Sequence, residues 1–349
     1  MRRTSEITYR YRSLHRKNLF WIGPLALAGL CSIGVTPARA GQAATPKRTL
    51  YSASRSLSRK ATLARARAQA TAREMADTVV PRYKVDANGE LVPDLRAAAG
   101  IIYNPETGQV LWEENSQTPR SIASITKVMT ATVFLEDNPD GSQPVTIARS
   151  DVFAASTTFL HANDRVTVDD LLHLLLIPSD NAAARALARV SPQGSVGFVG
   201  RMNDKAAELG LESTHYADPS GLLSDNVSSA YDMARLITHA SADDRIASIM
   251  RTQEYTVHAA KRDITFRSTD HLLGRDDIDV RAAKTGFISK SGYCLATLLR
   301  LPQSDQQVAV VVLGARTNAG RFLETENLFA WLATKASTIF ATKVSSSNQ

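Results

Sequence analysis

The pattern of hydrophobic and polar positions is typical of a folded domain after about the first ninety residues. Apolar runs at 97–103 and 109–113 flank a turn at 104–108, and together they predict two strands joined as a hairpin. The next apolar run begins at Ile122 and carries few charges, so it predicts a helix that ends near Glu136.

Helical patterns continue through the middle of the chain. Thr167 is expected to cap a helix that ends before Pro178, because a threonine side chain accepts a hydrogen bond from the first turn. The alanine-rich segment 182–188 is a strong helix former. We expect two more helices, at 196–209 and at 229–240 with Ser228 as the cap of the second.

The C-terminal part of the chain favours strands. Its apolar patterns predict strands at 255–259, 263–268, 280–287, 293–301 and 307–313, and then a helix at 322–336. Strands, then helices, then strands and a last helix indicate an α+β fold, in which helices cover an antiparallel sheet. A polar tail, placed at 338–349, closes the chain.

Charge is distributed unevenly along the 349 residues. Residues 1–80 contain 15 lysines and arginines against three acidic residues, whereas residues 81–349 contain 26 against 31. The basic character therefore belongs to the N-terminal region. A nucleic-acid-binding function for the main domain is not expected.

The first forty residues have the pattern of a secretory signal peptide. Six basic residues lie within the first 17, an apolar run covers 19–35, and a small-x-small sequence ends at Ala40. This pattern predicts cleavage near Ala40 and export to the periplasm or cell envelope. An uncleaved membrane anchor is the alternative, although the apolar run is short and contains Pro24.

Residues 41–80 are rich in alanine, arginine and serine and offer little apolar area to bury. We expect a mobile linker or a lone basic helix. The segment is either a solvated tether or a peripheral attachment to anionic envelope polymers and lipid headgroups. The folded domain is then expected at 81–337.

The two cysteines, Cys31 and Cys294, are too few for a disulfide framework. Cys31 lies in the predicted leader. Cys294 lies in an apolar run, so we interpret it as a small buried hydrophobic residue rather than a reactive thiol.

The sequence Ser-Ile-Thr-Lys at 124–127 can support chemistry on the predicted helix. Residues three apart on a helix lie on the same face, so the Ser124 hydroxyl and the Lys127 amine can meet. A lysine beside a serine can act as its base. The structural alternative is an ordinary early-helix serine and a surface lysine.

Two further motifs follow, Ser179-Asp180-Asn181 and Lys284-Thr285-Gly286. The order S-x-x-K, S-D-N, K-T-G is that of class A β-lactamases and penicillin-binding proteins. S-D-N also occurs at 224–226, but we favour the copy at 179–181. This copy lies between two predicted helices, where a rigid loop can direct side chains into a cleft. The structural alternatives, when each residue is taken alone, are that Asn181 caps a helix and that Lys284 is a charged residue at the edge of a strand.

Residues 95–336 resemble the D-alanyl-D-alanine carboxypeptidase and endopeptidase family of low-molecular-weight penicillin-binding proteins. Beyond the three motifs, the resemblance extends to 218–222, 226–234, 284–287 and 292–295, and 266–273 is similar to the endopeptidase branch. The resemblance implies a β-lactamase/transpeptidase-like α+β fold. This fold has an antiparallel sheet of about five strands and a helical subdomain.

The resemblance implies a cofactor-independent serine peptidase that forms an acyl-enzyme on Ser124. Lys127 would be the base if partly neutral, and burial near a second cation, Lys284, would favour that state. Ser179 would hydrogen-bond Lys127 and relay a proton to the leaving amine. Asn181 would hold Lys127 and the substrate amide in register.

The implied substrates are peptidoglycan peptides that end in D-alanine or are crosslinked through it, and β-lactams would be covalent inhibitors. The backbone N–H groups of Ser124 and Phe287 would form the oxyanion hole. Thr285 and Arg321 would bind a terminal carboxylate. The alternative for Arg321 is a helix residue that faces water. The implied substrate-binding residues are Lys284, Thr285, Gly286, Phe287 and Arg321.

Other functions remain open at this point. A β-lactamase on the same fold would need a carboxylate to activate water, and no E-x-x-L-N segment follows Ser179. A non-catalytic wall-binding protein could use the basic segment. The block at 266–273 favours an endopeptidase, whereas Arg321 favours a carboxypeptidase. The sequence lacks G-x-S-x-G and H-E-x-x-H motifs, and its histidines form no metal-like pair.

Overall fold

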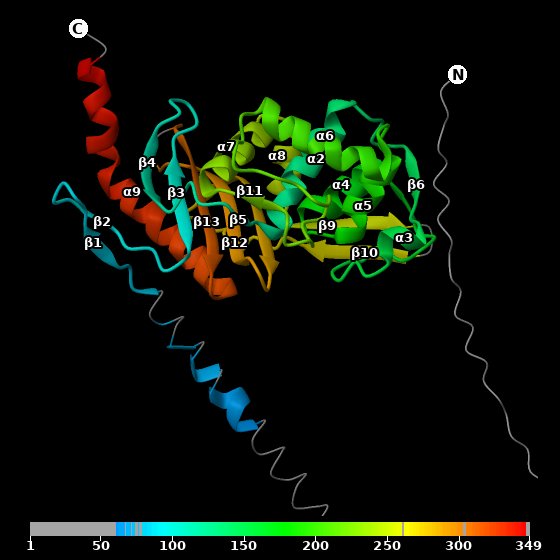
Figure 1. Ribbon diagram of the computed structural model, residues 1–349, viewed down its shortest axis with the longest axis horizontal. Helices are drawn as coiled ribbons and strands as arrows, with labels where there is room; N and C mark the ends of the chain where they lie inside the picture. The colour runs from blue at the N-terminus through cyan, green and yellow to red at the C-terminus, as the bar shows by residue number, and fades with distance from the viewer. Residues whose placement is uncertain are drawn as a thin grey trace, which may run out of the picture. The chain divides into compact units, whose positions relative to one another are not determined.

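The computed structural model of the chain, shown in Figure 1, describes residues 61–66, 68–70, 72–73, 76, 79–259, 262–302 and 305–346. The predicted signal peptide at 1–40 and the first part of the predicted linker lie outside the described residues. The described positions between 61 and 76 are helical and exposed.

A five-stranded antiparallel sheet forms the centre of the fold (Figure 1). Its order is β11 (Asp279–Ile288), β12 (Gly292–Arg300), β13 (Gln307–Ala315), β3 (Ala99–Tyr103) and β4 (Val110–Glu114). The predicted α+β class is therefore confirmed, as is the hairpin at the N-terminal end of the domain. β11 is an edge strand, so one of its sides remains available to the helical part of the protein.

The predicted strands at 255–259 and 263–268 do not join this sheet. They form a separate hairpin of β9 (Glu254–Ala259) and β10 (Arg262–Arg267). The reason is packing, because the apolar residues of this hairpin, among them Val257 and Phe266, belong to the core shared with the helices.

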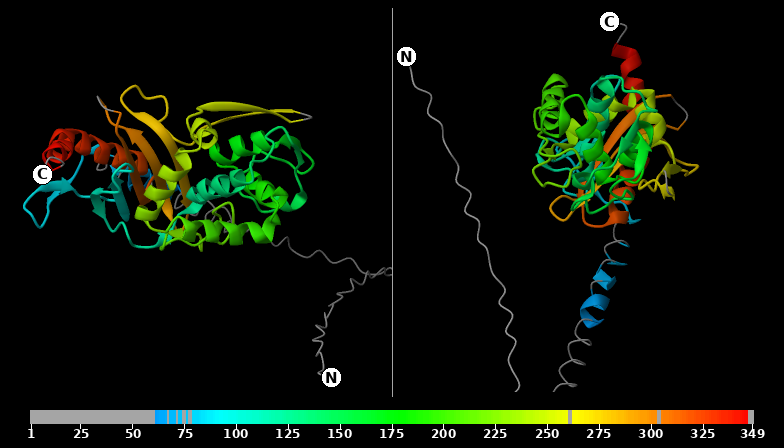
Figure 2. Two further views of the ribbon diagram at one scale, coloured as in Figure 1. Left: turned by 90° about the horizontal axis from the view of Figure 1, so that it is seen from above. Right: turned by 90° about the vertical axis from the view of Figure 1, so that its right-hand side faces the viewer.

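Two hydrophobic cores lie on opposite faces of the central sheet. Side chains alternate along β13, so Ala309, Val311 and Leu313 face one core whereas Val308 and Val310 face the other. The first core is shared with the group of helices, and the second with α9 (Asn318–Ser346). Figure 2 shows α9 on one side of the sheet and the other helices on the opposite side. The order of layers is thus helix, sheet, helices.

The helices between β4 and β9 form the helical part of the domain. They are α2 (Thr126–Glu136), α3 (Arg149–Val152), α4 (Val168–Leu176), α5 (Asn181–Val190), α6 (Gly194–Glu208), α7 (Ala230–Ser241) and α8 (Asp244–Met250). In α2 every residue from Thr126 to Leu135 is buried, so this helix passes through the core instead of lying on the surface.

Helix ends agree only partly with the sequence predictions. Thr167 caps α4 as predicted, since its hydroxyl accepts a hydrogen bond of 3.0 Å from the Asp170 amide. The predicted cap of α7 was wrong by one residue, because Ser229 caps this helix. Ser228 instead belongs to β8 (Val227–Ser228).

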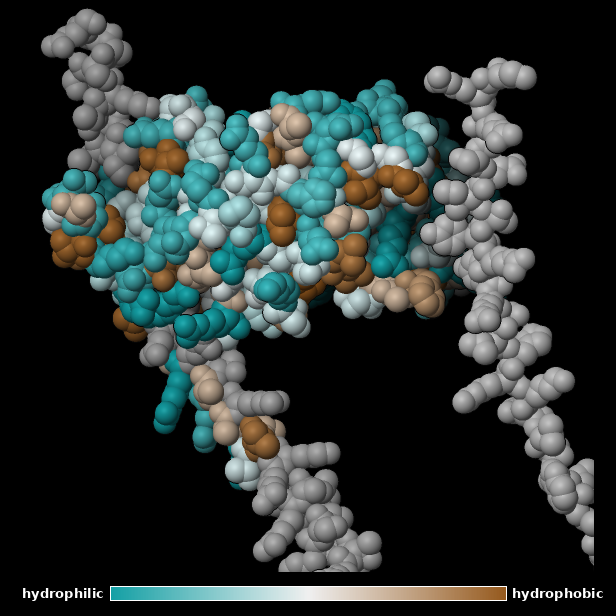
Figure 3. Space-filling view, viewed as in Figure 1, coloured by the Kyte–Doolittle hydropathy of each residue, from teal (hydrophilic) through white to brown (hydrophobic). Residues whose placement is uncertain are grey.

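Short strand pairs complete the fold. They are β1 (Tyr83–Val85) with β2 (Leu91–Pro93), β5 (Arg120–Ser121) with β8, and β6 (Pro144–Thr146) with β7 (Arg165–Thr167). The surface in Figure 3 is mainly hydrophilic, and its exposed hydrophobic residues form small separate patches. Among the described helices, none is both long enough and apolar enough to cross a bilayer.

Candidate active site

One cavity of about 560 Å³ gathers most of the residues that the sequence indicated. Seven of the nine predicted site residues line it, namely Ser124, Ser179, Asn181, Thr285, Gly286, Phe287 and Arg321. The other two, Lys127 and Lys284, are 0% and 1% exposed. The structure thus brings together segments that are up to two hundred residues apart. The second S-D-N copy does not line this cavity, and its Ser224 and Asp225 are exposed.

The nucleophile and the base that the sequence predicted are in direct contact. Ser124 lies in η1 (Ala123–Ile125), a 3-10 turn directly before α2, and Lys127 lies in the first turn of that helix. The Lys127 Nζ donates a hydrogen bond of 3.0 Å to the Ser124 Oγ. This is the reach that a base needs in order to remove the serine proton.

Burial gives the Lys127 amine its reactivity. The Nζ makes two further contacts of 2.6 Å, to the Oδ1 of Asn181 and to the backbone carbonyl of Ser220. Burial lowers the pKa of Lys127 to about 7, although the negative charges of Asp180 and Asp218 oppose this shift. A substantial fraction of the amine is therefore neutral near neutral pH.

Lys284 is the second buried cation of the site. It lies on β11 and donates a hydrogen bond of 3.0 Å to the carbonyl of Thr285. Burial lowers its pKa well below the ordinary value, and the nearby charges of Lys127 and Arg321 lower it further. Lys127 thus lowers the pKa of Lys284, whereas the cation that lowers the pKa of Lys127 is Arg185 and not, as predicted, Lys284.

Ser179 differs from the prediction. It lines the cavity and has a φ of 67°, a left-handed conformation that directs the tight turn before α5. Its hydroxyl oxygen makes no hydrogen bond to any described protein group, so the predicted contact with Lys127 is absent. The physical reason is that the three donors of the ammonium are already taken by Ser124, Asn181 and Ser220.

Asn181 is the first residue of α5 and holds Lys127 as predicted. Its Oδ1 accepts from the lysine, while its Nδ2 donates 2.7 Å to the carbonyl of Ala155. Its backbone amide donates to the carbonyl of Thr157. These contacts also fix the loop that presents Ser156 and Thr157 to the cavity, two lining residues that the sequence analysis missed.

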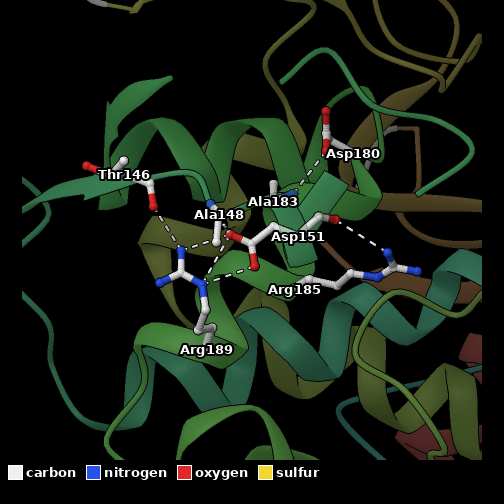
Figure 4. Close-up of polar contacts among 7 residues, drawn as sticks. All are labelled: Thr146, Ala148, Asp151, Asp180, Ala183, Arg185 and Arg189. Atoms are coloured by element: carbon white, nitrogen blue, oxygen red, sulfur yellow. Dashed lines mark hydrogen bonds and ion pairs between the residues drawn. The ribbon is translucent and has the colours of Figure 1, made fainter. Parts of the chain in front are cut away.

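Helix α5 is itself held firmly, and Figure 4 shows the contacts that do this. Asp180 caps the helix, since its Oδ1 accepts a hydrogen bond of 3.0 Å from the Ala183 amide. At the other end, Arg189 forms an ion pair of 2.8 Å with the buried carboxylate of Asp151. Arg185 donates to the backbone carbonyl of Asp151 at 3.4 Å, as Figure 4 shows, and also to the carbonyl of Phe153, which the figure does not draw, at 2.6 Å. The position of Asn181 is therefore set by interactions along the whole helix.

Gly286 permits β11 to approach the nucleophile. A Cβ at this position would lie 2.7 Å from the carbonyl oxygen of Ile122 and 3.1 Å from the amide nitrogen of Ser124. Only glycine fits such a close contact between backbones without displacement. The backbone of β11 at Gly286 is consequently held beside the amide of Ser124.

The hydroxyl of Thr285 has a partner that the sequence analysis did not foresee. It lies 2.6 Å from the hydroxyl of Thr269, which also lines the cavity. Asp270 follows and is buried. Burial raises the pKa of Asp270 to about 6, while the charges of Arg321 and Lys284 lower it. The next residue, His271, stacks on Phe322 with 4.7 Å between the two ring centroids.

Arg321 lines the cavity and is only 6% exposed, which excludes the alternative of a helix residue facing water. Its Nη1 donates to the carbonyls of Gly286 and Cys294 at 3.1 and 3.2 Å, and its Nη2 donates 2.5 Å to Asn318. The guanidinium therefore joins β11, β12 and the start of α9. Cys294 is buried with a free thiol, as predicted.

Among the described residues, no group of three or more histidine, cysteine, aspartate or glutamate side chains lies in a position to hold a metal ion. A buried, partly neutral lysine beside a cavity-lining serine, on a helix against an antiparallel sheet, defines an active-site-serine enzyme of the penicillin-binding class.

The comparisons with known proteins agree with this class. Residues 86–317 match the D-alanyl-D-alanine carboxypeptidase family, to which the chain therefore belongs. The D-alanyl-D-alanine endopeptidase of Pseudomonas aeruginosa is 33% identical over 248 residues, which are 70% of this chain and 79% of the relative. The carboxypeptidase DacC of Escherichia coli is 33% identical over 257 residues, which are 68% and 62% of the two chains.

Solved structures of penicillin-binding proteins and DD-peptidases have a fold similar to that of this chain. The Streptomyces K15 DD-transpeptidase has a TM-score of 0.64 at 28% identity, and the match covers 68% of this chain and 97% of that one. Penicillin binding protein 6B from Escherichia coli has a TM-score of 0.63 at 29% identity, and the match covers 72% and 81%. The fold is thus that of the penicillin-binding proteins, and the protein is a serine DD-peptidase.

Proposed function

We propose that this protein hydrolyses the D-alanyl peptide bonds of peptidoglycan stem peptides through an acyl-enzyme on Ser124. The observation that carries the proposal is the contact of 3.0 Å between the Ser124 Oγ and the buried Lys127 Nζ. Neutral Lys127 removes the serine proton while the oxygen attacks the D-alanyl carbonyl. The charge that develops on the carbonyl oxygen is held by the backbone N–H groups of Ser124 and Phe287.

The proton that Lys127 has accepted must reach the leaving amine when the peptide bond breaks. The charged Lys127 returns it from its position beside the Ser124 oxygen. Ser179 lines the cavity and its Oγ has no hydrogen-bond partner among the described residues, so we assign it the contact with that amine. Burial and the positive charge of Arg185 keep the ammonium form of Lys127 unfavourable and so promote this transfer.

Water then hydrolyses the ester and releases the peptide. A fast penicillinase would need a carboxylate to activate this water. Among the described residues that line the cavity, none is aspartate or glutamate. This supports slow deacylation, so that β-lactams act as covalent inhibitors rather than as substrates.

We infer that crosslinked peptides are the preferred substrates. Arg321 lines the cavity, and three of its five donors are taken by Gly286, Cys294 and Asn318, while its Nε has no partner among the described residues. A cation in this position is compatible with either substrate, so the inference rests on the similarity to endopeptidases. The relatives named endopeptidases and the similarity of 266–273 to that branch support the same assignment.

Defined muropeptides test both parts of the proposal. The purified protein is incubated with a monomeric pentapeptide and with a crosslinked dimer, and the products are separated by chromatography. We expect monomers to be released from the dimer faster than free D-alanine from the pentapeptide. Faster release of D-alanine would assign the protein as a carboxypeptidase, and absence of both products would contradict the DD-peptidase mechanism.

We further propose that the protein acts in the periplasm or cell envelope after cleavage near Ala40. The signal-peptide pattern of residues 1–40 supports this, and the basic segment 41–80 supports at most a peripheral envelope association. Mass spectrometry of the protein from fractionated cells tests it. A chain that begins near Gly41 is expected, whereas an intact N-terminus in the membrane fraction would favour an anchor.

A further inference from the structure

The loop of residues 218–226, here named the Asp218 loop, contacts the catalytic base directly. The Nζ of Lys127 donates to the carbonyl oxygen of Ser220 at 2.6 Å, a shorter distance than its 3.0 Å contact with Ser124. The acceptor belongs to the backbone, so its position depends on the conformation of the loop and not on the Ser220 side chain.

Asp218 determines that conformation. Its Oδ1 accepts hydrogen bonds from the amide of Ser220 at 2.7 Å, the hydroxyl of Ser220 at 2.5 Å and the amide of Gly221 at 2.9 Å. Its Oδ2 accepts from the amide of Leu223 at 2.7 Å and the Nδ2 of Asn226 at 2.8 Å. One carboxylate thus satisfies five donors of the loop.

The Asp218 loop is also pressed against the nucleophile and tied to α2. Gly221 has a φ of 79°, and a Cβ there would lie 2.0 Å from the carbonyl oxygen of Ala123. The hydroxyl of Thr130, one turn after Lys127, donates 2.6 Å to the carbonyl of Pro219. Two successive carbonyls of the loop therefore accept hydrogen bonds from two successive turns of the same helix.

Three charged groups shift the pKa of the Lys127 amine. Asp180 before α5 and Asp218 favour its charged form, whereas Arg185 on α5 disfavours it. Lys127 in turn lowers the pKa of Lys284 on β11. Burial raises the pKa of Asp218, but the hydrogen bonds of the loop outweigh burial and keep this pKa below its ordinary value. Asp218 is therefore ionised whenever the enzyme works.

We propose that Asp218 is a positioning residue for Lys127, which holds the Ser220 carbonyl against the amine and places a fixed negative charge near it. The proposal rests on the proposed function, in which Lys127 is the base for Ser124. Two consequences follow. The carbonyl orients the lone pair of the neutral amine toward the serine, and the carboxylate sets the pH at which that amine becomes neutral.

The two consequences are separated by measuring the acylation rate of the full-length protein with a fluorescent penicillin between about pH 5 and 9. In Asp218→Asn the negative charge is lost, so the pKa of Lys127 falls. The acid limb of the profile is the pH range in which the rate falls as Lys127 becomes protonated. We expect this limb to move to lower pH by about half a unit or more. The plateau rate should fall about tenfold, because the loop loses acceptors for Leu223 and Asn226.

Asp225→Asn is the matched control, since it removes the same charge from an exposed position of the same loop. It should leave both the limb and the plateau unchanged. A folded Asp218→Asn protein whose acid limb stays at the wild-type pH would overturn the electrostatic part of the proposal.

The geometric part is tested at Thr130 without any change of charge. Thr130→Val removes the donor to the Pro219 carbonyl at nearly constant volume and should slow acylation about tenfold with no shift of the limb. Thr130→Ser should restore the rate. Wild-type rates in Thr130→Val would contradict positioning through the loop. If Asp218→Asn fails to fold, the Thr130 variants still test the geometric part of the proposal. A wild-type protein that is not acylated at all would instead refute the proposed function itself.

Discussion

The Oδ1 of Asn181 accepts a hydrogen bond of 2.6 Å from the Nζ of Lys127, a residue 54 positions earlier in the chain. This contact joins the start of α5 to the first turn of α2. Since Lys127 also contacts Ser124 and Ser220, its amine has no remaining donor. The amine of Lys127, the proposed catalytic base, is thus held by groups from three separate segments, and each can be tested on its own.

Ser124→Ala is expected to abolish covalent labelling by fluorescent penicillin, because no other group replaces the attacking oxygen. Lys127→Ala should reduce the labelling rate by roughly 10³-fold, the usual contribution of a general base. Thermal melts of both variants check that they fold. Labelling of Ser124→Ala at the wild-type rate would assign the nucleophile elsewhere.

The acylation rate should depend on pH through Lys127. Burial lowers the pKa of this amine to about 7, and only the neutral form accepts the serine proton. The rate is therefore expected to reach a plateau above pH 7 and to fall about tenfold for each pH unit below it. Stopped-flow or gel-based labelling across this range measures the limb. A profile that is flat down to pH 5 would show that Lys127 is not the base.

Asn181→Asp places a carboxylate where the amide oxygen of Asn181 now accepts from Lys127. A negative charge in direct contact stabilises the ammonium form and raises its pKa by about one unit or more. The acid limb should consequently move to higher pH, opposite to the shift expected for Asp218→Asn. Asn181→Ala should lower the rate without an upward shift, and serves as the comparison.

Gly286→Ala tests the close approach of β11 to the nucleophile. The added Cβ would lie 2.7 Å from the carbonyl oxygen of Ile122, so the strand must move away from Ser124. We expect acylation to slow by about 10²-fold, since displacement of an oxyanion-hole donor has an effect of that size. Circular dichroism should show a folded protein. An unchanged rate would argue against an oxyanion hole between these two segments.

Asp151→Asn tests how α5 is supported. The Asp151 side chain is 3% exposed and pairs with Arg189, which is one third exposed. Removing the buried partner of such a pair should cost about 2 kcal/mol, a value below the range for fully buried pairs. The melting temperature should then fall by about 4–8 °C. Asp277→Asn, in an exposed pair with Arg275, is the control and should leave the melting temperature unchanged.

Local pattern was sufficient for much of the fold, whereas the choice of site residues also needed the family resemblance of the three motifs. A continuous apolar run located β13, and the spacing of Ser124 and Lys127 placed the two residues on one helical face. These predictions depend on periods of two and 3.6 residues, which a sequence displays directly. The motifs then indicated which distant segments meet at the cavity.

Only the tertiary structure decided how the base is held. The third acceptor of Lys127 is the backbone carbonyl of Ser220. Every residue has a backbone carbonyl, so the residue type does not indicate which one will accept this hydrogen bond. The same competition for donors separates Lys127 from Ser179, contrary to the prediction. Which atoms share a buried amine depends on packing between segments far apart in the chain, so the sequence determined the reactive groups and the fold determined their partners.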